Sequence, residues 1–383
     1  MTKPGRQVLQ PGQKIRVLIV DDSVVIRRLI ANAVEADPQL ELAGVAMDGK
    51  MALEKMRLLK PDVITMDIEM PRMNGIDAVR GIRKENSQAR IIMFSSLTER
   101  GAAITLEALS VGADESVLKI AGEGSLEASQ KRLREELLPR VKQFFHFPPD
   151  AGVAATAAPV LKAPATRWAA SGGTAPQVIG IGISTGGPKA LEALLPAIPK
   201  GYPLPILIVQ HMPPLFTRML AERLNTLCPL EVSEAAAGDA IEPGKILIAP
   251  GNFHMRVTGG AARPRVALDQ APPLNSCRPA VDALFLSLAE TYGGAVAAAI
   301  LTGMGNDGMV GAAALKKKGA YIIAQDEATS VVWGMPGAVV TAGLADAVLP
   351  LSEMGGALGQ VLRWRGGTAP QPTAARREEL CRR

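Results

Sequence analysis

The sequence predicts an α/β protein built from two doubly wound parallel-sheet domains that are joined by a flexible linker. In residues 14–146, short β-branched runs alternate with amphipathic segments, which is typical of a parallel sheet covered by helices. In residues 178–365, strand-like runs again end in polar or glycine-rich loops. Residues 147–177 are rich in alanine and proline and lack periodic apolar positions, as expected of a linker. We expect residues 1–13 to be an N-terminal extension and residues 366–383 to be a disordered tail.

The composition indicates a cytoplasmic protein. The chain has 383 residues, of which 48% are hydrophobic, and a net charge of +5. This length is enough for two domains, and so small a charge gives no argument for nucleic-acid binding. The three cysteines are not spaced as a metal knuckle or a redox pair, which suits a reducing compartment. No apolar run approaches the roughly 20 residues that span a bilayer, so we expect no membrane insertion.

The first domain is expected to contain five strands, at residues 14–20, 40–46, 63–66, 91–94 and 117–118. Ser23 is expected to cap the helix that follows the first strand. Polar side chains follow four of the strands and are Asp21, Asp22, Asp67, Ser95 and Lys119. Because the working site of such a sheet lies beyond the carboxyl ends of its strands, these side chains should meet. Three carboxylates would repel one another unless a cation such as Mg²⁺ neutralises them, and one of them could then accept a phosphoryl group.

This domain closely resembles the receiver domain of two-component response regulators. The matching stretches are Val-Asp21-Asp22-Ser, Met-Asp67-Ile-Glu-Met-Pro71-Arg-Met-Asn-Gly75, Met-Phe-Ser95-Ser and Leu-Lys119. The resemblance implies a flavodoxin-like fold with Asp67 as the phosphoacceptor and a histidine kinase as the phosphodonor. It implies that Mg²⁺ is held by Asp21, Asp22, Asp67 and the backbone carbonyl of Glu69. It also implies that Ser95 is the switch hydroxyl and that Lys119 pairs with the phosphoryl group. Ile120 departs from the family, in which proline commonly follows the lysine.

The second domain begins with a buried strand-like run, Val178–Ile183, that ends in Ser184 and two glycines. Gly182 and Gly186 bracket Ser184 at the G-x-S-x-G spacing, which allows a nucleophile to stand on a sharp turn between a strand and a helix. A helix that opens at Pro188 would direct free N–H groups toward negative charge that develops there. We therefore interpret Ser184 as a catalytic nucleophile.

Two other interpretations of this stretch stay open on its own evidence. Gly180, Gly182 and Gly186 form a loose dinucleotide-binding pattern, which requires an acidic residue about 20 positions further on. The chain has no acidic residue between Glu192 and Glu222, and this weighs against a cofactor loop. The stretch could also be a glycine-rich turn without any chemistry.

A nucleophilic serine needs a base, and histidine is the usual one. Of the three histidines in the chain, His146 lies beside the linker, His211 follows a strand-like run, and His254 lies in an expected hairpin. We favour His211 and keep His254 as the alternative. Asp307 lies in a glycine-dense loop after another strand-like run, where it could hold the histidine tautomer. The neighbouring glycines would let backbone N–H groups face an oxyanion.

The second domain resembles the catalytic domain of chemotaxis receptor methylesterases, which are response regulators that hydrolyse glutamate methyl esters on chemoreceptors. The matching stretches are Ile-Gly182-Ile-Ser184-Thr185-Gly186-Gly187-Pro188, Val-Gln210-His211-Met212, Ile-Ala-Pro250-Gly251-Asn-Phe-His254-Met255, Arg278-Pro279-Ala-Val-Asp282 and Leu-Thr-Gly303-Met304-Gly305-Asn-Asp307-Gly308. The resemblance implies a triad of Ser184, His211 and Asp307. It implies an oxyanion hole formed by the backbone N–H of Met304 together with Thr185. Cys277 departs from the family, where relatives often carry histidine.

The whole sequence therefore predicts a phosphorylation-activated protein-glutamate methylesterase, a serine-type carboxylic ester hydrolase that acts on methyl-accepting chemoreceptors in chemotaxis adaptation. The same site could also deamidate glutamines on these receptors. We expect Mg²⁺ in the receiver domain and no cofactor in the catalytic domain. Two alternatives are a non-catalytic two-component regulator that acts through protein contacts and a receiver-controlled hydrolase with a substrate outside chemotaxis.

Overall fold

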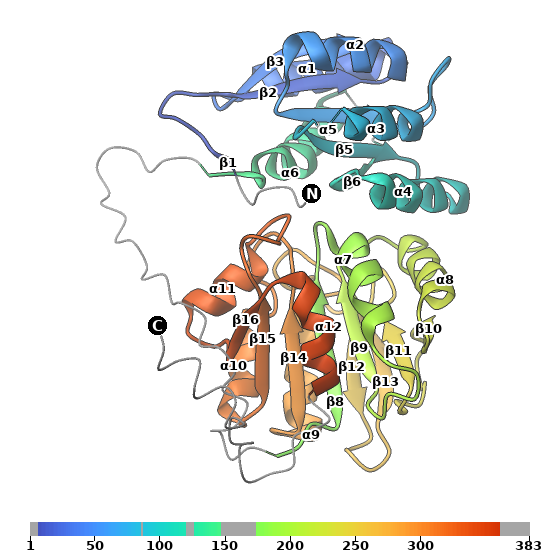
Figure 1. Ribbon diagram of the computed structural model, residues 1–383, viewed down its shortest axis with the longest axis vertical. Coiled ribbons are helices and arrows are strands. Elements are labelled where there is room, and N and C mark those ends of the chain that lie inside the picture. Colours follow the sequence, from blue (N-terminus) through green and yellow to red (C-terminus); the bar gives the residue numbers. More distant parts are fainter. Residues whose placement is uncertain (1–6, 86, 120–125, 147–173, 361–383) are drawn as a thin grey trace, which may run out of the picture.

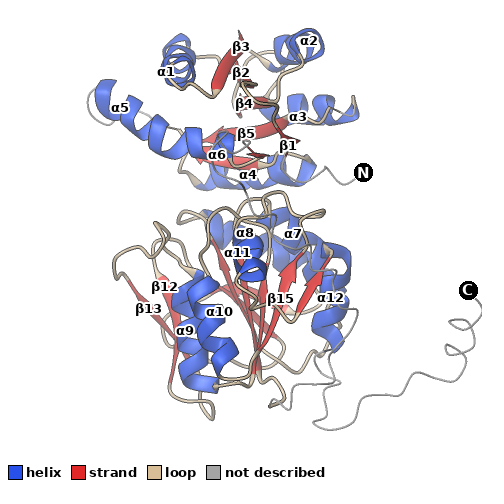
Figure 2. Ribbon diagram, turned by 90° about the vertical axis from the view of Figure 1, so that its left-hand side faces the viewer, coloured by secondary structure: helices blue, strands red, loops and turns tan. Residues whose placement is uncertain are grey.

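The computed structural model describes residues 7–85, 87–119, 126–146 and 174–360, and Figures 1 and 2 show these residues in two views. Two α/β units with separate sheets lie one above the other (Figure 1). Ile120, most of the expected linker and the expected tail lie outside the described residues. Within them, no helix combines the length and the apolar character that crossing a bilayer requires.

The first sheet has five parallel strands in the order β3-β2-β4-β5-β6. The strands are β2 (Ile15–Val20), β3 (Leu40–Ala46), β4 (Val63–Asp67), β5 (Arg90–Ser95) and β6 (Glu115–Leu118). The connecting helices are α1 (Val24–Glu35), α2 (Gly49–Leu59), α3 (Gly75–Lys84) and α4 (Glu99–Val111). Because parallel strands connected by helices in this order form the flavodoxin-like arrangement, the predicted fold of this domain is confirmed.

Polar side chains fix where these helices begin. Ser23 caps α1 by accepting a hydrogen bond from the backbone N–H of Ile26, as predicted. Asp48, Asn74 and Thr98 cap α2, α3 and α4 in the same way. Such side chains satisfy N–H groups that have no partner inside the helix. They therefore define the points at which the chain leaves the carboxyl edge of the sheet.

The first domain ends in a helix that is interrupted by a π-helical turn and is followed by a short strand. Helix α5 (Leu126–Arg132) passes through a π-helical turn (Leu133–Leu137) into α6 (Leu138–Lys142). Strand β7 (Phe145–His146) follows and pairs in parallel with β1 (Gln7–Val8), which lies in the expected N-terminal extension. Phe144 and Phe145 are buried in the core cluster of this domain, so they hold the end of the domain against its sheet.

The second sheet has seven parallel strands in the order β10-β11-β9-β8-β14-β15-β16. The strands are β8 (Val178–Ile183), β9 (Ile206–Gln210), β10 (Glu231–Glu234), β11 (Lys245–Ile248), β14 (Val296–Ile300), β15 (Tyr321–Gln325) and β16 (Ala347–Leu349). An antiparallel hairpin of β12 (His254–Thr258) and β13 (Arg265–Asp269) stands beside the sheet. The helices are α7 (Gly187–Leu194), α8 (Phe216–Leu227), α9 (Val281–Tyr292), α10 (Met309–Lys317), α11 (Met335–Thr341) and α12 (Leu351–Gln360). The predicted parallel-sheet class is thus confirmed for this domain as well.

The glycines of β8 serve close packing. A Cβ atom on Gly182 would lie 2.4 Å from Cγ1 of Val281, and one on Gly180 would lie 2.8 Å from Cδ1 of Leu288. Both glycines therefore lie inside a strand, at the points where α9 packs directly against it. A dinucleotide-binding loop places its glycines in the turn that faces the pyrophosphate. The arrangement in β8 disfavours the cofactor-loop interpretation of this stretch.

Candidate functional site

The carboxyl edge of the first sheet gathers the predicted acidic residues. Asp21, Asp22 and Asp67 each offer a carboxylate oxygen, and these oxygens all lie within 4.8 Å of one another. Asp21 and Asp67 are buried, whereas Asp22 is exposed. Lys119 Nζ lies 2.6 Å from Asp67 Oδ1. Ser95, at the end of the adjoining strand β5, is also buried.

The electrostatics of this edge suit a divalent cation. Burial and the charge of Asp67 raise the pKa of Asp21 to about 6. Burial also raises the pKa of Asp67, although Lys119 opposes that change. Within the described part of the chain, Asp21 Oδ2, Asp67 Oδ2 and Ser95 Oγ have no hydrogen-bond partner. Buried carboxylate oxygens without donors are the ligands that Mg²⁺ takes in proteins. Glu69 points its side chain into solvent, 3.9 Å from Arg100, so only its backbone carbonyl is available to such an ion.

In the second domain, Ser184 lies on a tight turn between β8 and α7. Its backbone N–H donates to the Thr302 carbonyl at 2.9 Å, and its own carbonyl accepts from the Gly187 N–H at 2.7 Å. Gly186 has a φ of +79°, which favours glycine. A Cβ atom on Gly303 would lie 2.7 Å from the Ser184 Cβ. The turn after Ser184 therefore needs glycine at position 186, and the loop that approaches Ser184 needs glycine at position 303.

His211 directly follows the neighbouring strand β9 and lies beside the Ser184 turn. The His211 N–H donates to the carbonyl of Ile183 at 3.1 Å. The side-chain amide of Gln210 donates to the carbonyls of Ser184 and His211, at 3.0 and 3.2 Å. Gln210 thus fixes the backbone of both residues, a function that sequence reasoning did not identify.

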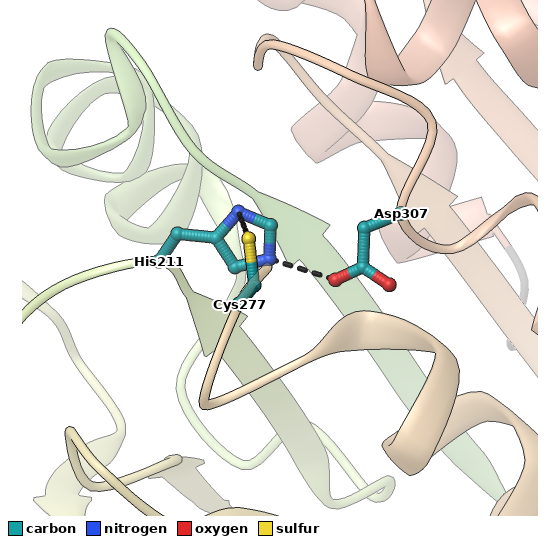
Figure 3. A group of neighbouring side chains, drawn as sticks. All are labelled: His211, Cys277 and Asp307. Carbon is teal, nitrogen blue, oxygen red and sulfur yellow. Dashed lines mark hydrogen bonds and ion pairs between the residues drawn. The ribbon is translucent and has the colours of Figure 1, made fainter. Parts of the chain in front are cut away.

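Asp307 binds the imidazole of His211 and is held by several donors. His211 Nε2 lies 2.8 Å from Asp307 Oδ2 (Figure 3). The same oxygen accepts the N–H of Val281 at 2.6 Å. The other carboxylate oxygen accepts the N–H groups of Asp282 and Gly308, at 3.1 and 3.0 Å. Burial by itself would raise the pKa of Asp307, but the hydrogen bonds and charge of its partners, His211 first, lower it. Asp307 is therefore an anion at neutral pH.

The other ring nitrogen of His211 faces a thiol. His211 Nδ1 lies 3.5 Å from Cys277 Sγ (Figure 3), and no hydrogen bond joins it to the Ser184 hydroxyl among the described residues. Burial lowers the pKa of His211, but hydrogen bonds and charge from Asp307 and Cys277 raise it to about 9. In this conformation the imidazole is therefore a cation at neutral pH and must lose a proton before it can act as a base.

The alternative base His254 has a different environment. It is fully buried, its Nδ1 accepts the N–H of Ala280 at 3.2 Å, and its Nε2 lies 3.2 Å from the carbonyl of Pro272. Both ring nitrogens thus bind backbone, which is typical of a histidine that stabilises a fold. This arrangement favours His211 over His254 as the base.

The two residues predicted for the oxyanion hole lie in different surroundings. Met304 is 41% exposed. Its neighbour Gly303 holds this loop in place, because its N–H donates to the Val332 carbonyl and its carbonyl accepts the N–H groups of Gly334 and Met335. Thr185 is buried, and its hydroxyl contacts the Glu115 carboxylate and lies 3.2 Å from the Gln143 amide oxygen. Its side chain is therefore engaged by the first domain, so only its backbone N–H is available to an oxyanion.

A second residue that sequence reasoning missed is Asn275. Its side-chain amide donates to Asp282 Oδ2 at 2.9 Å and to Asp307 Oδ1 at 3.1 Å. It thereby couples the loop before α9 to the predicted triad. Asparagine favours turns and a positive φ, and this preference was the one available signal, because nothing in the sequence spacing links residue 275 to residue 307.

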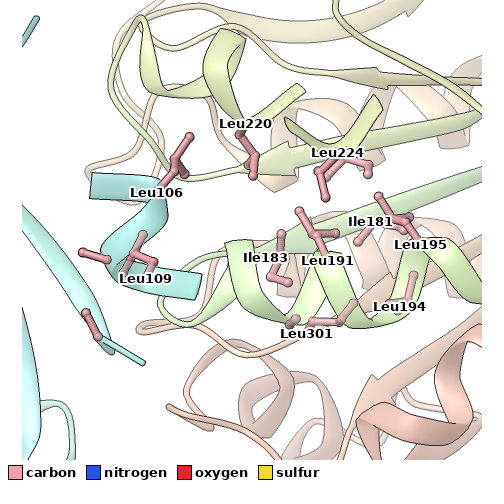
Figure 4. Packing of buried hydrophobic residues seen from close by; sticks show 14 of the residues in the cluster. Leu106, Leu109, Ile181, Ile183, Leu191, Leu194, Leu195, Leu220, Leu224 and Leu301 are labelled. Carbon is pink, nitrogen blue, oxygen red and sulfur yellow. The ribbon is translucent and has the colours of Figure 1, made fainter. Parts of the chain in front are cut away.

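The first domain covers the carboxyl edge of the second sheet. Helix α4 packs against α7 and α8, where Leu106 and Leu109 of α4 join a buried cluster with Leu191 and Leu220 (Figure 4). This contact lies beside the loop that carries Ser184 and Thr185. The first domain therefore stands directly over the candidate active site.

Polar contacts surround this apolar cluster. Ser110 Oγ donates to Glu192 Oε1 at 2.7 Å and lies 2.9 Å from Nη2 of Arg223. Arg223 also contacts Glu192, and Arg218 of α8 forms an ion pair with Glu99 of α4. These side chains are partly exposed, so they form a rim that can exchange its hydrogen bonds with water.

Comparisons with known proteins find relatives for both domains. Residues 179–358 match the family described as CheB methylesterase, and residues 17–130 match the response regulator receiver domain. A protein-glutamate methylesterase/protein-glutamine glutaminase of Nocardioides sp. is 52% identical over 90% of this chain and 94% of its own length. A protein of the same name from Thermotoga maritima is 44% identical over 88% of this chain and 95% of its own length. The crystal structure of the Thermotoga maritima CheB methylesterase catalytic domain is 42% identical and covers 49% of this chain and 100% of that domain, with a TM-score of 0.48.

We expect the imidazole of His211 to titrate near pH 9 rather than near its ordinary value of 6.5. The measurement is an NMR titration of the histidine ring signals, assigned with a His211→Gln variant. Because the hydrogen bond and charge of Cys277 help to raise this pKa, Cys277→Ala should lower it, and Asp307→Asn should lower it as well. The distant Cys228→Ala should leave it unchanged. A pKa near 6.5 in the unaltered protein would contradict the geometry described above.

Proposed function

The chain belongs to the CheB methylesterase family, and on this premise we propose that Ser184, His211 and Asp307 carry out its hydrolytic reaction. The protein is a protein-glutamate methylesterase of chemotaxis with a receiver domain ahead of its catalytic domain. Its substrates are glutamate methyl esters on chemoreceptors. The observation that supports the assignment best is the His211–Asp307 hydrogen bond at 2.8 Å, formed beside the turn that carries Ser184.

The proposed reaction starts when Ser184 Oγ attacks the ester carbonyl carbon. His211 takes the serine proton on Nδ1 and then gives it to the departing methoxy group, so methanol leaves and an acyl-enzyme remains. A water molecule, deprotonated by His211, then attacks this intermediate and releases the glutamate side chain. Asp307 stabilises the imidazolium that forms twice in this cycle. For this role Nδ1 must turn from Cys277 toward Ser184, and catalytic hydrogen bonds commonly tighten only when substrate binds.

Backbone N–H groups would stabilise the oxyanion. We assign this role to Met304 and Thr185, which lie on the two loops that approach each other at Gly303 and Ser184. The same chemistry with ammonia as the leaving group would deamidate glutamine, and we propose this second activity for the same residues.

We propose that Asp67 is the phosphoacceptor of the receiver domain and that a histidine kinase supplies the phosphoryl group. Asp21, Asp22, Asp67 and the Glu69 carbonyl would hold Mg²⁺, which supplies positive charge near the phosphoryl oxygens. Lys119 and Ser95 would contact those oxygens. The buried carboxylate oxygens without donors and the Lys119–Asp67 distance of 2.6 Å support this assignment.

The receiver domain would control access to Ser184. Ser95 lies three residues before Thr98, the cap of α4, so a change at the switch hydroxyl reaches this helix directly. Helix α4 carries the leucines that pack on α7 and α8. Phosphorylation of Asp67 would therefore weaken the contact between the domains and admit the receptor segment. Because the residues proposed for hydrolysis and those proposed for phosphorylation are all present, a non-catalytic regulator is disfavoured.

Replacing the nucleophile should abolish the hydrolysis. We expect Ser184→Ala to lower methanol release from methylated receptor membranes by about 10³-fold or more, because the acyl-enzyme can no longer form. Ser352→Ala, an exposed serine on α12, serves as the control and should keep the full rate. A Ser184→Ala variant that retains the wild-type rate would exclude this nucleophile.

Replacing the phosphoacceptor should remove the response to a phosphodonor and leave the basal rate intact. We expect Asp67→Asn to incorporate no phosphoryl group from acetyl phosphate and to show no stimulation of methanol release. Chelation of Mg²⁺ should have the same effect on the unaltered protein. The exposed Asp77→Asn should respond as the wild type does, and stimulation that persists in Asp67→Asn would place the phosphorylation elsewhere.

Weakening the contact between the domains should raise the basal rate. Arg223→Ala removes a hydrogen bond to Ser110 of the first domain and the contact with Glu192 of the second domain, which itself binds Ser110. One hydrogen bond across this contact contributes about 0.5–1.5 kcal/mol. We therefore expect methanol release without phosphodonor to increase by about two- to tenfold. The control is Arg57→Ala, whose partner Glu85 lies within the receiver domain. If the unphosphorylated rates of the two variants are equal, these contacts do not restrain the enzyme.

A further inference from the structure

Cys277 takes no part in the proposed hydrolysis, yet it lies against the catalytic base. Its Sγ is 3.5 Å from His211 Nδ1, whereas the Asp307 carboxylate binds the other ring nitrogen, Nε2 (Figure 3). One nitrogen, one sulfur and one oxygen atom from these three residues all lie within 4.8 Å of one another. These possible metal-binding atoms include nitrogen and sulfur, whereas the group around Asp67 offers only oxygen. The two groups would therefore bind different metal ions.

The backbone presents the thiol rigidly. Leu274 and Cys277 exchange two backbone hydrogen bonds, at 3.1 and 2.8 Å. The two residues between them, Asn275 and Ser276, both have positive φ, at +50° and +62°. The side chain of Asn275 fastens this turn to Asp307. Because the turn is fixed at its backbone and at one side chain, Cys277 is held beside His211.

The donor atoms and their separation suit zinc. Zn²⁺ binds thiolate at about 2.3 Å and imidazole at about 2.0 Å, and at a tetrahedral angle these bonds place the two atoms about 3.5 Å apart. The separation of Sγ and Nδ1 is 3.5 Å. A carboxylate that binds the second ring nitrogen of a metal-bound histidine orients the ring and strengthens its binding. Asp307 holds this position on His211.

We propose that Cys277 and His211 form an inhibitory Zn²⁺ site, with Asp307 orienting the imidazole. Binding would release the thiol proton and any proton on Nδ1 to solvent, and water would complete the coordination. The metal would occupy the lone pair of Nδ1, which must accept the proton of Ser184. Metal binding is independent of the proposed function, whereas the inhibition rests on it.

The site is open to ions. Leu274, Asn275 and Ser276 are exposed, so Zn²⁺ can reach the thiol across this turn without separation of the domains. Mg²⁺ prefers oxygen ligands and octahedral geometry, so it would occupy the Asp67 edge and leave Cys277 free. The two candidate metal sites therefore differ in selectivity.

The first experiment uses Co²⁺ as a spectroscopic probe for the full-length protein in excess Mg²⁺. Cys381 lies outside the described residues, so it is replaced by serine in every sample. We expect a near-ultraviolet thiolate-to-cobalt absorption band that Zn²⁺ abolishes by displacement.

Cys277→Ser should lose this band and bind Zn²⁺ at least about tenfold more weakly. The control Cys228→Ser alters a half-buried cysteine at the end of α8. It should retain the absorption band and the affinity for Zn²⁺. A missing band in the parent, or a band that persists in Cys277→Ser, would overturn the proposal.

The second experiment measures basal methanol release in buffered Zn²⁺, with each variant compared with its own zinc-free rate. We expect zinc to inhibit the parent and the Cys228→Ser variant, a zinc-selective chelator to restore their rates, and Cys277→Ser to resist inhibition.

Cys277→His supplies a new nitrogen ligand, so it should bind zinc without showing the thiolate band. This variant therefore separates the loss of a ligand from misfolding. Zinc binding that depends on Cys277 but leaves the rate unchanged would overturn the inhibitory role. A parent protein with the cobalt band but no esterase activity would instead contradict the proposed function.

Discussion

The hydrogen-bonded carboxylate of Asp307 is the constraint on which the second domain's site depends. It accepts hydrogen bonds from His211, from the backbone at the start of α9, and from Asn275 in the preceding turn. The segments around His211, residues 275–282 and Asp307 itself are far apart in the sequence, and they thus meet at one buried anion. Such a group is costly to bury unless donors surround it, and the donors keep the pKa of Asp307 low. The position of His211, the proposed catalytic base, follows from this network.

The two domains use the same property of parallel sheets for different chemistry. In each, the carboxyl ends of neighbouring strands bring polar side chains to one edge. At the first edge, the buried aspartates and Lys119 create a site suited to a cation and a phosphoryl group. At the second edge, glycines let Ser184 and the β14 loop approach closely. Helix α4 links them physically, because it begins near Ser95 and packs beside the Ser184 turn.

The two ring nitrogens of His211 contact different side chains, and these two contacts have opposite consequences for the proposed reaction. Asp307 binds one ring nitrogen, as the proposed proton transfer requires, while Cys277 contacts the nitrogen that the proposed nucleophile Ser184 would use. The thiol and the carboxylate together hold the imidazole in its charged form at neutral pH. In the proposed mechanism this conformation is a resting one, because the receiver domain covers the site and Cys277 contacts the nitrogen that must accept the serine proton.

The sequence by itself determined the two α/β domains and most of the residues that meet at the sheet edges. This was possible because strand periodicity, capping side chains such as Ser23 and the common edge of parallel strands are local or topological rules. Only the tertiary structure decided the rest. Cys277 approaches His211 through a turn with two positive φ values, Thr185 contacts Glu115 of the receiver domain, and His254 is enclosed by backbone. These contacts depend on distances between loops and between domains, which the spacing of residues along the chain does not encode.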